Sequence, residues 1–246
     1  MTEFTIKLAD VPISARVCFD TTKDFCRDYI TDETGELEIE ISPEDILRER
    51  GINARQMALE GLAQSGFSDA YMETLALYRK IADRLVARNV LLFHGCVIAC
   101  EGKAFVFTAK SGTGKTTHCR LWLENIPDCH ILNGDKPLLL FRDGAVYACG
   151  TPWQGKEKYG TNEILPVEGI CILTRDIANH IESVSFSEAF PVLVSQFHKP
   201  NGTVSPELMK LFSQLGSVKL WRLGCNMDKE AAFVAYNGLI GGVTKA

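Results

Sequence analysis

The chain has 246 residues, of which 46% are hydrophobic and 23% are charged, as in a globular protein of one domain or of one domain with a small appendage. Its net charge of −5 argues against a nucleic-acid-binding surface, and no apolar run approaches the roughly 18 residues that span a membrane. We therefore expect neither a nucleic acid nor a membrane as a partner. The N-terminus lacks the basic and apolar segments of an export signal, which predicts a cytoplasmic protein.

Nine cysteines are scattered along the chain without any C-x-x-C pair. Several of them lie inside apolar runs that are typical of strands, namely Cys96, Cys100, Cys149 and Cys171. Thiols in such runs are usually buried, and cytosolic proteins keep them reduced. We therefore expect buried, reduced cysteines, because their spacing is not that of a metal cluster.

The N-terminal part of the chain, residues 1–60, is expected to form a small α/β extension before a nucleotide-binding domain at residues 61–246. Period-2 alternation predicts strands over 4–8, 13–19 and 37–41, one or two helical turns over 24–30, and a short helix that begins at Ser42-Pro43. This segment carries no recognisable chemistry. A lid, a docking module and an edge extension all remain open as its role.

The clearest helix is predicted over residues 68–87, where apolar side chains recur at helical spacing and form a core face. Two strand-like runs follow at 90–100 and 103–109, and Glu101-Gly102 between them is a tight hairpin signal. The second run leads directly into a glycine-rich turn. The strand before that turn is therefore expected to be half of an antiparallel hairpin.

Residues 105–117, with the sequence FVFTAKSGTGKTT, give the order strand, glycine loop and helix that is typical of a phosphate-binding loop. Backbone N–H groups and the positive end of the helix would hold the phosphates of a nucleotide triphosphate. The predicted nucleotide-binding residues are Ser111, Gly112, Thr113, Gly114, Lys115, Thr116 and Thr117. One position departs from the full pattern, because Ala109 stands where the first glycine is expected.

Within this loop Lys115 can reach the outer phosphates, and the Thr116 hydroxyl can hold a magnesium ion. A second metal ligand should come from a carboxylate beyond the loop. Asp135 is the best candidate, because it ends the apolar run at 130–134 about twenty residues later. The alternative is an ordinary turn aspartate before Lys136-Pro137.

His94 and Lys156 are two further candidates for catalysis. His94 precedes Gly95 on the strand that pairs with the loop strand, so it can orient a catalytic acid or a phosphate; the alternative is a core histidine. Lys156 lies in the polar loop TPWQGK, where its charge can neutralise the transferred phosphoryl group; the alternative is a solvated surface lysine.

Further strands are predicted at 130–134, 138–141, 145–150, 168–175 and 219–223, and further helices at 186–197, 205–215 and 229–239.

Taken together, His94-Gly95, the run SGTGKTT and Asn133-Gly-Asp135 resemble the kinase domain of HPr kinase/phosphorylase and its relatives. The run is also similar to the nucleotide loop of ATP-dependent phosphoenolpyruvate carboxykinase, which shares that fold. The resemblance implies an α/β domain with α+β character, in which helices flank a mixed, partly antiparallel sheet. It also implies ATP, Mg²⁺ and transfer of the γ-phosphate to a hydroxyl, with His94, Lys115, Thr116 and Asp135 at motif positions.

We therefore expect an ATP-dependent phosphotransferase that acts on a protein or peptide serine or on a small-molecule hydroxyl. Relatives of HPr kinase have two adjacent acids where this chain has Gly134-Asp135, so three roles of Asp135 remain open: base, metal ligand or both. A nucleotide-binding sensor or assembly factor without turnover is one alternative. A small-molecule carboxykinase-like enzyme is another, but it needs clustered arginines, and Arg120, Arg142 and Arg175 are scattered. The acceptor and the oligomeric state are left open.

Overall fold

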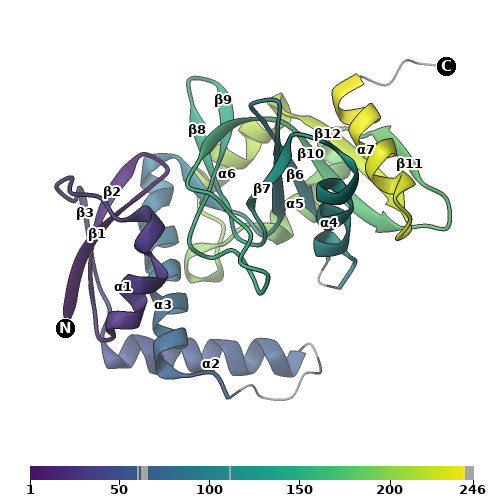
Figure 1. Cartoon of the computed structure of the whole chain (residues 1–246). Helices are drawn as coiled ribbons and strands as arrows, with labels where there is room; N and C mark the ends of the chain where they lie inside the picture. Colours follow the sequence, from purple (N-terminus) through teal and green to yellow (C-terminus); the bar gives the residue numbers. More distant parts are fainter. Residues whose placement is uncertain (60, 62–65, 111, 242–246) are drawn as a thin grey trace. The chain divides into compact units, whose positions relative to one another are not determined.

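The computed structural model describes residues 1–59, 61, 66–110 and 112–241. The chain divides into two compact units, Met1–Leu85 and Val86–Ala246. This division lies further along the chain than the boundary expected after residue 60, because helix α3 (Asp69–Leu85) packs against α1, α2 and β3 of the first unit. Each unit is described by itself below (Figure 1).

The first unit combines a three-stranded sheet with helices. Its elements are β1 (Thr2–Leu8), β2 (Val11–Val17), α1 (Asp20–Phe25), β3 (Leu37–Glu40), α2 (Pro43–Leu59) and α3. Strands β1 and β2 form a hairpin whose two turn residues, Ala9 and Asp10, both have positive φ, as a type I′ turn requires. Strand β3 pairs with β2 in parallel. The three predicted strands are confirmed, whereas the first helix begins at Asp20 and not at residue 24.

A buried carboxylate connects α3 to the start of α1. Glu73 has no exposed surface, and it accepts the N–H groups of Cys18 and Phe19 at 2.6 and 3.1 Å and the hydroxyl of Thr22. The two N–H groups lie at the N-cap of α1 and one residue before it, so this carboxylate satisfies partly buried backbone donors at the start of the helix and a buried hydroxyl. The charged side chain therefore belongs to the framework of the first unit.

The second unit contains a nine-stranded mixed sheet among the described residues. Its strands are β4 (Val90–Leu92), β5 (Cys96–Cys100), β6 (Lys103–Thr108), β7 (Cys129–Asn133), β8 (Leu138–Arg142), β9 (Ala145–Cys149), β10 (Ile164–Arg175), β11 (His180–Ser183) and β12 (Lys219–Cys225). Its helices are α4 (Lys115–Asn125), α5 (Phe186–Gln196), α6 (Pro206–Gln214) and α7 (Glu230–Gly241). β11 is not among the elements predicted from the sequence, and β4 and β5 replace a single predicted strand; the other elements agree with the prediction.

The sheet is partly parallel and partly antiparallel. Strand β10 pairs in parallel with β6 on one side and with β12 on the other, while β5 pairs antiparallel with both β6 and β7. The predicted α/β class with a mixed sheet and flanking helices is therefore confirmed, as is the antiparallel hairpin that precedes the loop. Because β6, β10 and β12 run in the same direction, their carboxyl ends lie at one edge of the sheet (Figure 1).

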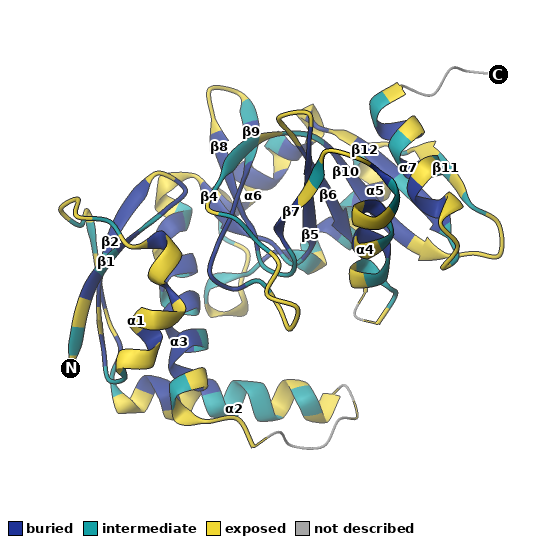
Figure 2. Cartoon of the chain, in the orientation of Figure 1, coloured by how far each residue is buried: buried dark blue, intermediate teal, exposed yellow. Residues whose placement is uncertain are grey.

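Two clusters of buried apolar residues lie on the two faces of this sheet. Figure 2 shows the central strands as largely buried. One cluster joins the sheet to α5 and α6 through buried residues such as Leu193 and Phe212, and the other joins it to α4 and α7 through Trp122 and Leu239. Strands β5, β6 and β8 are buried on both faces, which explains why they appear in the sequence as continuous apolar runs and not as alternating ones.

One predicted strand is interrupted. The sequence predicts a single strand over residues 90–100, but the structure has two. The first, β4, pairs with β8, and the second, β5, pairs with β6. In the break, the N–H of Phe93 donates to Pro137 O at 3.1 Å and the N–H of Gly95 donates to Asp135 O at 3.0 Å. His94 therefore lies between two strands and beside the segment that carries Asp135.

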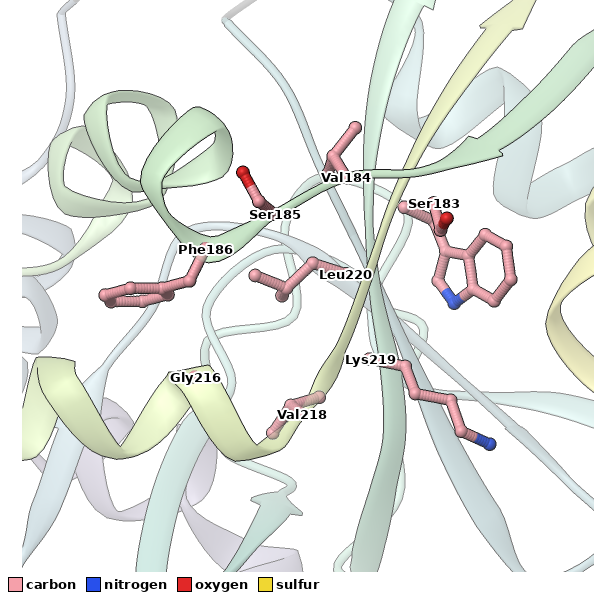
Figure 3. A pocket seen from close by; sticks show the side chains of 9 residues that line it. Ser183, Val184, Ser185, Phe186, Gly216, Val218, Lys219 and Leu220 are labelled. Atoms are coloured by element: carbon pink, nitrogen blue, oxygen red, sulfur yellow. The ribbon is translucent and has the colours of Figure 1, made fainter.

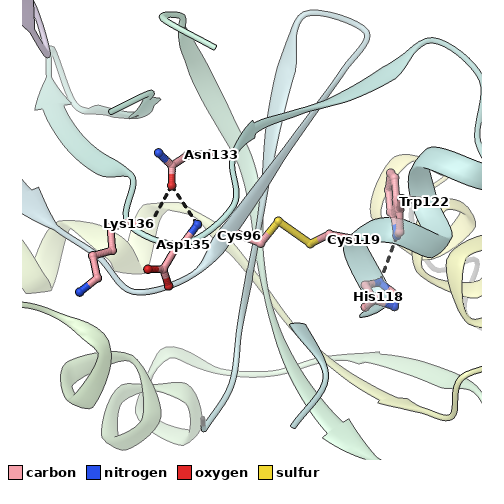
Figure 4. Close-up of a disulfide and its surroundings, with 7 residues drawn as sticks. All are labelled: Cys96, His118, Cys119, Trp122, Asn133, Asp135 and Lys136. Atoms are coloured by element: carbon pink, nitrogen blue, oxygen red, sulfur yellow. Dashed lines mark hydrogen bonds between the residues drawn. A yellow bond between two sulfur atoms is a disulfide. The ribbon is translucent and has the colours of Figure 1, made fainter. Parts of the chain in front are cut away.

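The expectation that the cysteines are reduced is wrong for two pairs. Cys96 on β5 is disulfide-bonded to Cys119 on α4 (Figure 4). Cys100 is disulfide-bonded to Cys129. The sequence spacing gave no sign of these pairs, because the strand pairing of β5 with β7 and the packing of α4 bring the residues together. Cys18, Cys26, Cys149, Cys171 and Cys225 are free.

Among the described residues, no helix combines the length and the apolar character that crossing a membrane requires.

Candidate functional site

The candidate site is the loop between β6 and α4. Gly112 and Gly114 have φ values of +76° and +121°, in the region that side chains with a Cβ rarely adopt. Gly114 is the N-cap of α4, which begins at Lys115. The N–H groups at this helix start have no helical partners and point out of the N-terminus, where an anion binds favourably. Ser111 lies outside the described residues.

The side chain of Lys115 is half-buried and is hydrogen-bonded to the residue at the start of the loop. Its Nζ donates to the carbonyl oxygen of Ala109 at 3.0 Å. Burial lowers the pKa of Lys115, and the charge of Asp135 acts in the opposite direction. Ala109 itself is buried in the cluster under α4, which accounts for a methyl group at the position where a glycine was expected. The lysine is therefore held close to the site before any ligand is bound.

The structure brings His94 and Asp135 together beside this loop. His94 Nε2 lies 3.3 Å from Asp135 Oδ1, and both side chains are partly exposed, at 42% and 32%. The carbonyl of His94 accepts the hydroxyl of the buried Thr108, the last residue of β6 before the loop. His94 therefore lies within reach of the Asp135 carboxylate, and its partly exposed ring is not that of a core histidine.

Gly95 explains why the backbone can take this path. A Cβ at this position would lie 2.8 Å from the carbonyl oxygen of Phe107 and 2.8 Å from the ring of Phe93. Contacts this short would push the chain away from β6 and would move His94 with it. Glycine is therefore required by the packing of this segment.

Burial by itself would raise the pKa of Asp135. The hydrogen bond from His94 and the charges of Lys136, His94 and Lys115 outweigh this effect and lower the pKa below its ordinary value of 3.8. Asp135 is therefore ionised at neutral pH. An ionised carboxylate can accept a hydrogen bond from a hydroxyl or can bind a divalent cation.

Asn133 sets the conformation of the turn that carries Asp135 (Figure 4). Its Oδ1 accepts the N–H groups of Asp135 and Lys136 at 3.0 and 2.7 Å. Its amide nitrogen donates to the carbonyl and the hydroxyl of Thr151, and that hydroxyl donates to Lys136 O. Asn133 and Thr151 have no exposed surface, so this network is shielded from water.

The polar loop at residues 151–160 packs against the same turn. A Cβ on Gly155 would lie 3.1 Å from the Cβ of Asp135, and the N–H of Gly134 donates to Tyr159 O at 3.0 Å. Lys156 follows Gly155 and is exposed. Trp153 is buried, so it anchors the loop. The loop that carries Lys156 therefore lies beside Asp135.

Gly134 has a steric requirement that bears on the missing second acid. A Cβ at this position would lie 2.8 Å from the carbonyl oxygen of Gln154 and 3.4 Å from that of Tyr159. An acidic side chain cannot be placed there unless the polar loop moves. Gly134-Asp135 is thus a consequence of how closely this loop packs.

His118 and Trp122 fix α4 onto the sheet behind the loop. Trp122 Nε1 donates to His118 Nε2 at 3.0 Å, and the His118 ring packs on Phe107 with ring centroids 4.9 Å apart. Burial lowers the pKa of His118 to about 4. A neutral histidine in this environment supports the helix and is not exposed to a ligand.

Sequence reasoning missed two residues that hold the site. The first is Asn133, and the sequence signal for its role is an Asn two residues before a turn aspartate. The second is Arg175, the last residue of β10, which the sequence shows only as an isolated arginine. It contacts the phosphate loop, because its Nη2 donates to Gly112 O at 2.5 Å and its Nε donates to Thr113 O at 3.3 Å. The parallel pairing of β10 with β6 makes this contact possible.

A cavity of about 350 Å³ lies elsewhere in the second unit, between the start of α5 and the start of β12 (Figure 3). Val184, Phe186, Val218 and Leu220 line it with apolar surface. The ammonium of Lys219 at its wall is paired with Glu168 at 2.6 Å. Its lining includes no residue of the phosphate loop, so we place the candidate site at the loop.

Comparison with known proteins adds little to this geometry. No protein-family model matches the chain, and no curated protein sequence matches it. Among solved structures, the HPr(Ser) kinase/phosphatase from Coxiella burnetii is similar to 61% of this chain and 97% of its own, with 7% sequence identity and a TM-score of 0.36. A TM-score of this size leaves the site to be judged from the residues of this chain.

Proposed function

We propose that this protein is an ATP-dependent phosphotransferase that moves a γ-phosphate to a hydroxyl of a protein or peptide serine or of a small molecule. The observation that carries the proposal is the His94–Asp135 pair, whose side chains lie 3.3 Å apart. The carbonyl of His94 is hydrogen-bonded to Thr108 at the end of the loop strand, so the pair lies beside the loop. Phosphoryl transfer needs mainly positioning and charge neutralisation, and these residues offer both.

The phosphates would be held by the N–H groups at the start of α4 and by Lys115, which would exchange its bond to Ala109 O for a phosphate oxygen. Thr113, Gly112, Ser111, Gly114 and Thr117 complete the proposed nucleotide-binding set. Lys156 would add positive charge where the phosphoryl group is transferred.

A magnesium ion would be held by the hydroxyl of Thr116 and the carboxylate of Asp135. Thr116 is exposed in the first turn of α4, and Asp135 is ionised and partly exposed, so the donor set is one of hard oxygen ligands that suits Mg²⁺. When bound, the ion would neutralise charge on the phosphates.

In the proposed reaction the acceptor hydroxyl donates its hydrogen bond to Asp135, which takes the proton as the oxygen attacks. The bond from the γ-phosphorus to the β-bridging oxygen breaks, the bond to the acceptor oxygen forms, and ADP leaves. His94, as the donor to Asp135, orients the carboxylate and is a positioning residue for this step.

Transfer of label from γ-labelled ATP tests the proposal. The purified chain would be incubated with Mg²⁺, ATP and separate acceptors that carry a hydroxyl: serine peptides, free serine and polyols. ADP release that depends on the acceptor and is lost in Asp135→Asn supports a phosphotransferase. ATP hydrolysis that no acceptor accelerates would contradict it.

A nucleotide sensor or assembly factor is the second candidate, and the packing of Gly134 favours it. Because a second acid cannot be placed at this position, Asp135 is the one carboxylate that the described Gly134-Asp135 turn offers for the two roles of base and metal ligand. Tight nucleotide binding without turnover toward any acceptor would support the sensor.

A further inference from the structure

The guanidinium of Arg175 is hydrogen-bonded to the backbone of the loop between β6 and α4. β10 pairs with β6 in parallel up to the level of Ile172 and Thr108, and β10 then continues for three residues while β6 gives way to the loop. This extension carries Arg175 to the loop, where it donates to the carbonyls of Gly112 and Thr113 at 2.5 and 3.3 Å. Two consecutive carbonyls thus bind one planar group.

The direction of these carbonyls determines the direction of the N–H groups that follow them. In a trans peptide the C=O of one residue and the N–H of the next point in opposite directions. A Gly112 carbonyl that faces Arg175 therefore turns the N–H of Thr113 inward, where it donates to Lys110 O at 3.2 Å. By the same geometry, the Thr113 carbonyl turns the N–H of Gly114 away from Arg175.

We propose that Arg175 is a positioning residue that holds the phosphate loop in the conformation that binds a nucleotide diphosphate unit. This inference rests on the proposed function and adds a residue to the same site. Both glycines of the loop have positive φ, and glycine has more backbone freedom than other residues, so the loop needs an external contact to stay in one conformation. Arginine suits this role because its fixed fork can donate to two acceptors at once.

The proposal makes a distinction between nucleotides. A residue that acts through loop N–H groups should affect ADP and ATP equally, whereas a side chain that contacts the γ-phosphate should affect ATP alone. Loss of hydrogen bonds from a charged group corresponds to roughly a 10-fold change in affinity. Lysine keeps the charge but cannot bind both carbonyls in the same way.

The test combines calorimetric titration of Mg²⁺-ADP and Mg²⁺-ATP with hydrogen exchange of the loop amides in the absence of nucleotide. We expect Arg175→Ala to weaken both nucleotides about 10-fold and to speed exchange at residues 112–115. Arg175→Lys should give a smaller loss of the same kind. Arg222→Ala is the control, because Arg222 pairs with Glu182 on the neighbouring strand β11 and leaves the loop untouched.

Two results would overturn the proposal. One is unchanged loop exchange with unchanged affinity for both nucleotides in Arg175→Ala, and the other is a loss confined to ATP, which would assign Arg175 to the γ-phosphate. If the parent protein binds neither nucleotide, the proposed function fails, and the exchange of the loop amides alone then decides whether Arg175 holds the loop.

Discussion

His94 Nε2 lies 3.3 Å from Asp135 Oδ1, although 41 positions separate the two residues in the sequence. Backbone bonds on both sides of His94 produce this contact: its own N–H donates to Gln196 O at 2.9 Å, and the next N–H donates to Asp135 O at 3.0 Å. The contact is therefore fixed by backbone hydrogen bonds of the short segments that connect β4 to β5 and β7 to β8. The following predictions test what this pair and its surroundings do.

The first prediction concerns the pair itself. Replacement of His94 by Ala removes the group that orients Asp135, so we expect transfer to slow roughly 10²–10⁴-fold while ATP affinity changes little. Rates and dissociation constants are measured on the same preparation. His180→Ala is the control, since His180 is an exposed histidine on β11. An equal loss of affinity and rate would assign His94 to nucleotide binding and not to the chemical step.

Lys115 is expected to contribute a full charge to the outer phosphates. Backbone N–H groups survive a side-chain change, so Lys115→Ala should weaken triphosphate binding roughly 10- to 100-fold and leave the fold intact. Calorimetry measures the affinity, and circular dichroism checks the fold. Lys229→Ala removes an exposed lysine before α7 and serves as the charge-matched control. Parental affinity in Lys115→Ala would place the nucleotide site elsewhere.

Replacement of the proposed metal ligand Asp135 should make the affinity for ATP independent of Mg²⁺. If Thr116 and Asp135 hold the same ion, Asp135→Asn should bind ATP almost equally with and without Mg²⁺, whereas the parent should bind better with it. Titration of ATP at several Mg²⁺ concentrations measures this difference. Asp143→Asn, in the exposed turn between β8 and β9, is the matched control. A magnesium effect of parental size in Asp135→Asn would assign the ion to another acid and leave Asp135 as base.

Buried Glu73 should stabilise the first unit. In Glu73→Ala the N–H groups of Cys18 and Phe19 lose their acceptor inside the protein, which costs about 3 kcal/mol of unfolding free energy. Urea unfolding measures this change. Glu38→Ala removes an exposed carboxylate of β3 and should change the free energy by less than about 0.5 kcal/mol. Equal midpoints for the two variants would contradict the role of Glu73.

The state of the cysteines can be counted. All nine lie in the part of the chain that the structure describes, and five of them are free, so the unfolded, unreduced protein should react with five equivalents of a thiol reagent. Prior reduction should raise the count to nine. Replacement of both Cys100 and Cys129 by Ala should lower the unfolding free energy by about 2–4 kcal/mol. Nine reactive thiols before reduction would restore the expectation of reduced cysteines.

The sequence by itself determined the elements that depend on local pattern. The apolar run, the two glycines and the lysine of residues 105–117 predict strand, loop and helix, because glycine allows the tight turn that joins a strand to a helix start in a phosphate-binding loop. The Glu101-Gly102 turn likewise predicts the antiparallel hairpin, since both residues take positive φ in a tight turn. These features need no information from distant parts of the chain.

Only the tertiary structure decided which distant side chains meet. Strand order and register determine three such contacts. These are the approach of His94 to Asp135, the hydrogen bonds from Arg175 to the loop and the disulfide between Cys96 and Cys119. The sequence does not reveal the break between β4 and β5 for the same reason. An apolar run has the same pattern whether all of it pairs with one strand or its two halves pair with different strands. Local propensity contains no term for these contacts; they arise when the sheet and its helices bury their apolar faces together.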